Sequence, residues 1–128
     1  MLRDLRAAGV PVHGVGLQRH VSLRYHATEA EISETMRRFA DAGLDVAITD
    51  VRADTADGRE RQLDAQRGVF LEGARACREQ PRCTSFTTWG VSDRYSWWER
   101  PEWMPLLFDE GFQAKPAYAA VHYWIQQP

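Results

Sequence analysis

The sequence lacks several features that would assign a protein to a class at once. None of its apolar runs approaches the length of a membrane span, and no cluster of Lys and Arg indicates a nucleic-acid surface. No second ligand stands at metal-binding spacing from His20 on a shared element. We therefore expect no membrane, no nucleic acid, and neither a metal nor another cofactor as a partner of this chain.

Asparagine is absent altogether and cysteine is scarce. The two cysteines, Cys77 and Cys83, are an even count at short spacing, and the sequence alone leaves open whether they pair or remain two partly buried thiols. The chain has 128 residues, a net charge of -2 and 44% hydrophobic residues. These values predict one globular domain.

The most informative stretch runs from Thr84 to Trp97. β-Branched and aromatic residues fill every position of 84–89 except Ser85, which predicts a buried strand, and Gly90 ends it. Trp89 and Trp97 therefore lie at the carboxyl end of a strand and on the loop beyond it. Open α/β sheets and (β/α)8 barrels place their ligand sites at this end of the strands.

The loop after Gly90 combines indole rings with polar side chains. Asp93, Arg94 and Ser96 accompany Trp97, and this mixture suits a ligand with apolar faces and hydroxyl edges, such as a sugar. The alternative is that Trp89 and Trp97 are anchors of the hydrophobic core. The sequence favours a sugar site because both indoles flank a polar loop.

Helical and extended patterns alternate along the chain. A helix tail is expected first, then three strand–helix units, with a capping box at the start of the first full helix. The predicted elements are a helix at Leu2–Ala8, a strand at Val12–Leu17, a helix from Thr28 to Gly43, a strand at Leu44–Thr49, a helix at about Glu60–Arg78, a strand at Thr84–Trp89 and a helix from Pro116 to Trp124. Alternation of this kind implies an α/β fold with parallel strands.

Two further strand ends carry polar side chains. Gln18 and His20 follow the first strand, and Asp50 follows the second. An amide and an imidazole can both hydrogen-bond sugar hydroxyls. The alternative for His20 is an ordinary loop histidine.

Four stretches together resemble the family-10 glycoside hydrolases, the endo-1,4-β-xylanases. They occur in the family's order and cover nearly the whole chain. The stretches are residues 14–20 (GVGLQRH), 43–49 (GLDVAIT), 89–97 (WGVSDRYSW), and 107–109 (LFD) running on to 115–118 (KPAY).

The resemblance implies a partial (β/α)8 TIM barrel. Such a barrel typically takes about 250 residues, whereas this chain has 128, and the matched stretches belong to the family's C-terminal half. We expect residues 1–128 to form a single partial barrel of about three C-terminal βα units with parallel strands.

The resemblance also implies a ligand and its binding residues. Xylan or xylo-oligosaccharides would contact Gln18, His20, Trp89, Arg94 and Trp97, with Gln18 and His20 lining the sugar subsite next to the cleaved bond. The matching family position of the two cysteines often carries a disulfide, which implies pairing of Cys77 with Cys83 in an oxidising compartment. Family members are secreted, and because Met1 leads into a stretch with no signal-peptide pattern, we expect any export signal to lie outside this sequence.

Hydrolysis by the family needs two carboxyl groups about 5 to 5.5 Å apart, a nucleophile and an acid/base. The nucleophile is a Glu at the end of the strand that here reads 45–49, followed by a second acid that orients the histidine at the position of His20. This chain has Asp50, Val51 and Arg52 instead. Either Asp50 replaces the Glu, or two residues are lost and Asp50 descends from the second acid.

Both alignments leave one shortened carboxylate. Alternation along a strand places Asp50 on the inward face in either case. It would sit roughly 1.5 Å back from the sugar, the order of one C–C bond. Misplacement of about 1 Å can cost a hundredfold in rate.

The acid/base carboxyl group is missing from this sequence. In the family it is the Glu of an Asn–Glu pair on an earlier strand, and this chain contains no asparagine. We therefore expect no meaningful xylanase turnover from the isolated chain.

Three functional interpretations remain open from sequence. The chain is an endo-1,4-β-xylanase-like glycoside hydrolase that lacks its acid/base half, or it is a non-catalytic module that binds xylan or xylo-oligosaccharides. The third is a half-barrel that hides open strand edges and an apolar inner face by self-association or by pairing with an N-terminal barrel half.

Overall fold

The computed structural model describes residues 1–54, 59–97 and 101–126. The helices and strands follow the expected order. They are α1 (Leu2–Ala7), β1 (Gly14–Ser22), α2 (Glu29–Asp41), β2 (Asp45–Asp54), α3 (Arg59–Glu79), β3 (Cys83–Thr88) and α4 (Pro116–Ile125), with 3-10 turns at Asp93–Tyr95 and Pro101–Trp103. Three strand–helix units preceded by a short helix are thus confirmed.

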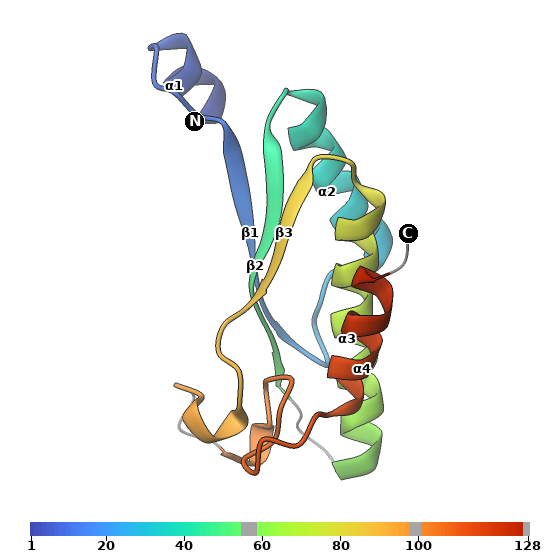
Figure 1. The fold of residues 1–128 in the computed structure, drawn as a ribbon. Helices are drawn as coiled ribbons and strands as arrows, with labels where there is room; N and C mark the ends of the chain where they lie inside the picture. Colours follow the sequence, from blue (N-terminus) through green and yellow to red (C-terminus); the bar gives the residue numbers. More distant parts are fainter. Residues whose placement is uncertain (55–58, 98–100, 127–128) are drawn as a thin grey trace.

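The three strands form one parallel sheet in the order β1-β2-β3. Helices α2, α3 and α4 lie along one face of this sheet, and the opposite face has no described helix over it (Figure 1). The long connection between β3 and α4 lies at the carboxyl ends of the strands (Figure 1). The fold therefore consists of two layers, with one sheet face left open.

The hydrophobic core lies between the sheet and the helices. Val46, Ile48 and Val51 of β2 are at most 1% exposed, and they pack with the fully buried Phe70 of α3 and Met36 of α2. Burying an apolar side chain of this size contributes about 1.5–3 kcal/mol. The central strand β2 and the helices on its covered face thus provide most of the apolar burial.

Helix α2 begins and ends where the sequence predicts. The Thr28 hydroxyl accepts a hydrogen bond from the N–H of Glu31 at 3.4 Å, and the Glu31 carboxylate accepts one from the N–H of Thr28 at 2.9 Å. This is the predicted capping box. Gly43 follows the helix with a φ of 78°, a conformation that glycine adopts without strain.

The open face of the sheet is lined by small and polar residues. Alternate residues of β1 on this face are exposed, and a Cβ added at Gly16 would lie 3.2 Å from the Thr49 methyl group, so β1 and β2 pack closely here. The residues of this face include Gly14, Gly16, Gln18, His20, Ala47, Thr49, Ser85 and Thr87. The expectation of an apolar inner face is therefore wrong.

Strands β1 and β2 continue past their expected ends. β1 reaches Ser22 and β2 reaches Asp54. Gln18, His20 and Asp50 consequently lie within strands rather than just beyond them. This placement also excludes the interpretation of His20 as a loop histidine, because its backbone is part of the sheet.

The prediction of a buried strand at residues 84–89 is wrong. Thr84, Ser85 and Thr87 of β3 are exposed. β3 is the edge strand of the sheet, and the face toward which Ser85 and Thr87 point has no described helix over it. Phe86 points to the covered face, where it approaches Gly73 of α3.

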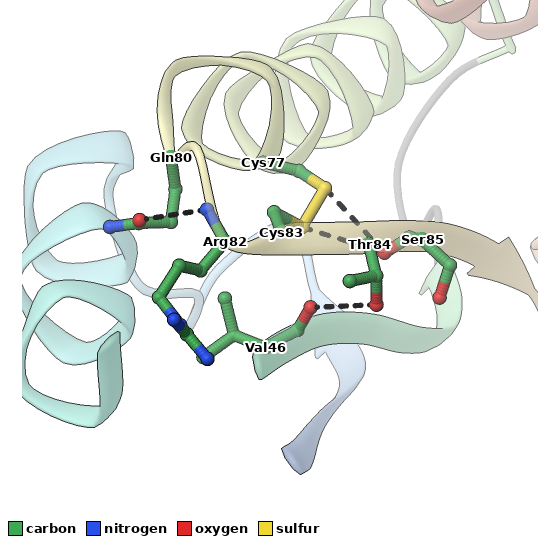
Figure 2. The surroundings of a disulfide bond; sticks show 7 residues. All are labelled: Val46, Cys77, Gln80, Arg82, Cys83, Thr84 and Ser85. Carbon is green, nitrogen blue, oxygen red and sulfur yellow. Dashed lines mark hydrogen bonds between the residues drawn. A yellow bond between two sulfur atoms is a disulfide. The ribbon is translucent and has the colours of Figure 1, made fainter. Parts of the chain in front are cut away.

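A disulfide joins Cys77, near the end of α3, to Cys83 at the start of β3 (Figure 2). The two Cα atoms are 5.3 Å apart. Next to it, the Thr84 hydroxyl donates a hydrogen bond to the carbonyl of Val46 at 3.3 Å (Figure 2). The amino end of β3 is thus fixed both to the helix layer and to β2.

Candidate functional site

The register of the sheet places the carboxyl halves of the three strands side by side. His20 of β1 is the register partner of Arg52 of β2. Val51 of β2 is the partner of Thr88 of β3 and accepts a hydrogen bond from the N–H of Trp89 at 3.5 Å. We call these strand ends, together with Trp97 stacked on Arg52, the strand-end rim: Gln18, His20, Asp50, Arg52, Trp89 and Trp97.

Gln18 and His20 present their side chains on the open face. They are two residues apart on β1 and both are exposed. Arg19, between them, points to the opposite face and is 6% exposed. An exposed amide and imidazole on one strand can donate and accept hydrogen bonds to the same polyhydroxylated ligand.

Arg19 fixes the backbone between these two residues, a role that sequence patterns did not indicate. Its guanidinium donates to the carbonyls of Ala27 at 3.2 Å and Val69 at 3.3 Å, and to the Glu72 carboxylate at 3.3 Å. Burial lowers the pKa of Arg19, and the charge of Glu72 opposes that shift. Arg19 therefore ties β1 and the turn after it to α3.

Asp50 lies in a bulge of β2. Its φ is 59°. Gln18 pairs with Thr49 and His20 pairs with Arg52, so two residues of β2, Asp50 and Val51, lie opposite the single residue Arg19 of β1. The side chain of Asp50 is 8% exposed, and no hydrogen bond or ion pair of its carboxylate is found within the described part of the chain. Simple alternation does not hold at a bulge, so the inward orientation of Asp50 stays a prediction.

The guanidinium of Arg52 stacks on the indole of Trp97. Its central carbon is 4.0 Å from the ring centroid, and Arg52 is only 5% exposed. Val51, the preceding residue, points into the core, so Arg52 lies on the open face. A cation thus lies in the middle of the rim.

Both rim indoles are exposed rather than packed in the core. Trp89 is 54% exposed and Trp97 is 56% exposed, so the alternative of two core anchors is wrong. Gly90 directly after Trp89 has a φ of 111°, and a Cβ at this position would lie 2.9 Å from the Leu106 side chain. Only glycine fits this turn, which leads the chain away from β3.

A buried ion pair fastens the connection that carries Trp97. The Lys115 ammonium lies 2.8 Å from the Asp93 carboxylate and donates to the Met104 carbonyl at 2.6 Å, and Asp93 also accepts from the N–H of Leu106 at 2.7 Å. Burial raises the pKa of Asp93 and lowers the pKa of Lys115. The hydrogen bond and the opposite charge of the partner act against both shifts, because each stabilises the ionised form of the other group. We call this pair the loop clasp.

The clasp corrects the interpretation of Asp93 as a sugar-binding group. Both of its carboxylate oxygens are engaged inside the loop, and the residue is 5% exposed. Arg94, the next residue, is exposed, and its guanidinium carbon is 5.8 Å from the ring centroid of Tyr95. Its role in substrate binding stays a prediction.

The described residues contain no group of three or more His, Cys, Asp or Glu side chains arranged to hold a metal ion. Among the same residues, no helix is both long and apolar enough to cross a membrane. The rim residues themselves supply indole faces, an amide, an imidazole, a guanidinium and one carboxylate.

The sequence profile described as glycosyl hydrolase family 10 matches residues 1–123. The chain belongs to this family. Endo-1,4-beta-xylanase 2 of Aureobasidium pullulans is 34% identical over 139 aligned residues, which cover 98% of this chain and 38% of that protein. The family-10 resemblance inferred from the four sequence stretches is thus confirmed.

Solved family-10 structures share the fold of this chain. Native xylanase 10B from Thermotoga maritima superposes with a TM-score of 0.88 at 30% identity, covering 98% of this chain and 40% of that one. Xylanase 10B from Thermotoga petrophila, solved in complex with xylobiose, gives the same values. The chain is therefore part of a (β/α)8 barrel and spans about 40% of the length of these relatives.

Proposed function

We propose that this chain is the C-terminal part of an endo-1,4-β-xylanase-type catalytic domain and holds part of a xylo-oligosaccharide site at its strand-end rim. One observation carries the proposal: Gln18 and His20 of β1 and Trp89 after β3 are distant in sequence but lie at the carboxyl end of one sheet, on either side of β2. Ligand sites of (β/α)8 barrels are built at this end. The xylobiose complex of the Thermotoga petrophila relative supports a β-1,4-xylose ligand.

The rim offers the contacts that a xylose chain requires. The exposed indoles of Trp89 and Trp97 provide flat apolar faces for sugar rings. Gln18 and His20 provide hydrogen bonds to hydroxyl groups. Such a site binds neutral saccharides without a cofactor.

Hydrolysis would need a carboxyl group from outside this chain. Asp50 is the one carboxylate of the rim, and we propose that it occupies the nucleophile position or the position next to it. A retaining glycosidase needs a second carboxyl group about 5 to 5.5 Å from the first as acid/base. We therefore propose that the isolated chain binds saccharide and has no meaningful turnover.

Isothermal titration calorimetry with xylotriose tests the binding proposal. We expect saturable binding that weakens about tenfold or more in Trp89→Ala, since loss of ring stacking on an aromatic side chain removes a main contact. Tyr123→Ala is the matched control, because Tyr123 is a 61% exposed aromatic residue of α4 on the helix layer. Absence of xylotriose binding, or equal weakening in both variants, would refute the proposal.

Reducing-sugar release from xylan tests the catalytic part. The purified chain should release no more sugar than Asp50→Asn, in which the carboxylate is removed. Turnover close to that of a full-length family-10 xylanase, abolished by Asp50→Asn, would refute the proposed lack of activity.

Completion of the barrel by another polypeptide is the second candidate. Among the described strands, β1 and β3 each have one edge without a neighbour, and unpaired edges are sites for strand addition. An N-terminal barrel half or a second copy of the chain would cover them. A monomer in sedimentation equilibrium that unfolds in one sharp transition would exclude the need for such a partner.

We further propose that the chain works in an oxidising, extracellular setting. The disulfide between Cys77 and Cys83 supports this, since structural disulfides persist in such compartments. Thiol quantification of protein recovered from the native source, with and without reductant, checks it. Free thiols in the unreduced sample would contradict this assignment.

A further inference from the structure

Arg52 covers one face of the indole that a sugar ring would use. Its guanidinium carbon lies 4.0 Å from the Trp97 centroid, which is contact distance for a plane stacked on the ring. Trp97 is nevertheless 56% exposed, while Arg52 is 5% exposed. The cation is thus enclosed beneath the indole, and the solvent reaches the rest of the ring.

A stacked guanidinium and a stacked sugar compete for the same surface. Both use the electron-rich face of the ring, the first through its charge and the second through its C–H groups. Since Arg52 is the register partner of His20, the enclosed face of Trp97 also points toward the rim rather than away from it. A saccharide lying along the rim would meet Arg52 before it reached that face of Trp97.

We propose that Arg52 is an internal cap on Trp97, which a saccharide must displace to stack on the rim-facing side of this indole. The inference rests on the proposed saccharide site and adds a determinant of its affinity. In this state Trp89 offers the accessible indole of the rim, and the side of Trp97 that faces Arg52 becomes available only when Arg52 moves.

Replacement of the cap by an uncharged side chain tests the proposal. Arg52→Met keeps an unbranched stem of similar length and removes the guanidinium. We expect xylotriose to bind Arg52→Met about two- to tenfold more tightly than the unmodified chain, because the ligand no longer competes with a cation–π contact. Unchanged binding would overturn the proposal. Weaker binding would overturn it too, because it would show that Arg52 itself contacts the sugar.

Arg75→Met is the matched control. The guanidinium of Arg75 stacks on Trp124 with its carbon 4.6 Å from the ring centroid, in the helix layer on the other face of the sheet. The same chemical change at the same kind of contact should leave the xylotriose dissociation constant unchanged. Equal tightening in Arg75→Met would overturn the proposal, because the effect would then not depend on the rim.

An NMR titration of the unmodified chain tests the cap without any substitution. Protons on Cδ of Arg52 are next to a guanidinium stacked on the Trp97 ring. We expect them to show an upfield ring-current shift that disappears as xylotriose saturates the site. If the upfield shift persists when xylotriose saturates the site, the proposal that Arg52 must be displaced is wrong, but the proposed saccharide site still stands. Absence of any xylotriose binding, in the unmodified chain and in Arg52→Met alike, overturns both.

Discussion

The ammonium of Lys115 and the carboxylate of Asp93 meet at 2.8 Å with side chains that are 5% and 1% exposed. They are far apart in sequence, at the two sides of the connection between β3 and α4. Through them, the loop that carries Trp97 is fastened by a buried ionic contact in addition to the packing of the buried Leu106. The position of Trp97 thus depends on a pair that lies inside the loop.

Removal of either partner of the clasp should destabilise the protein strongly. Asp93→Ala or Lys115→Met leaves the other charge buried and unpaired, and we expect a loss of about 3–5 kcal/mol in the free energy of unfolding. Urea denaturation measures it.

The exposed pair of Arg37 and Glu34 provides the control for the clasp. These side chains are 57% and 55% exposed, so Glu34→Ala should cost no more than about 0.5 kcal/mol. The double variant Asp93→Leu with Lys115→Met should recover most of the stability, because neither charge remains. A single clasp variant as stable as Glu34→Ala would contradict the account.

Substitution of Gly90 should also be destabilising. Gly90→Ala combines a φ of 111° with a Cβ at 2.9 Å from the side chain of Leu106, which is itself 1% exposed. We expect a loss of about 1–3 kcal/mol. Gly68→Ala in α3, where nothing lies within 4 Å of the added Cβ, should instead stabilise by about 0.5–1 kcal/mol. Thermal unfolding of both variants checks the difference in sign.

The capping box of α2 makes stability depend on pH. The Glu31 carboxylate accepts hydrogen bonds from the backbone N–H and the hydroxyl of Thr28, which lower its pKa from the ordinary value of 4.5. A lowered pKa means that the folded state favours the ionised form. The resulting stabilisation is present above pH 4.5 and is lost as the pH falls through the lower folded-state value.

Glu31→Gln should therefore be less stable than the unmodified chain at pH 7, and the difference should shrink in acid. Urea midpoints measured for both proteins from pH 7 to pH 3 test this expectation. A difference that stays constant across this range would show that the ionised carboxylate makes no contribution through the cap.

Asp50→Glu should restore reactivity toward a mechanism-based fluoro-sugar. The added methylene moves the carboxylate forward by roughly 1.5 Å, and an activated leaving group removes the need for an acid. We expect covalent labelling, followed by mass spectrometry, about a hundredfold faster than in the unmodified chain. Labelling of Asp50→Asn at the same rate would show that another residue reacts.

Much of the fold was predictable because its signals are local. The capping box of Thr28 and Glu31 and the break at Gly43 lie within a few residues of the structure that they determine. The order of strands and helices followed from the same kind of pattern. The exposure of Thr84 and Thr87 was not predictable, because it depends on β3 being an edge strand with one uncovered face.

Most members of the rim were predictable from the sequence, but Arg52 and the contacts between the side chains were not. Gln18, His20 and Trp89 follow from strand ends, whereas the bulge at Asp50 depends on the register with β1. The stacking of Arg52 on Trp97 depends on the path of a long connection, and no pattern within β2 indicates it. Contacts between residues so far apart in sequence can be identified only from the tertiary structure.

An NMR chemical-shift map with xylotriose shows whether the strand ends bind saccharide. We expect the side-chain signals of Gln18, His20 and Trp89 to shift together and yield a single dissociation constant, while signals of α3 and α4 remain in place. Shifts confined to the helix layer, or rim signals that do not move at millimolar xylotriose, would contradict a saccharide site at the strand ends.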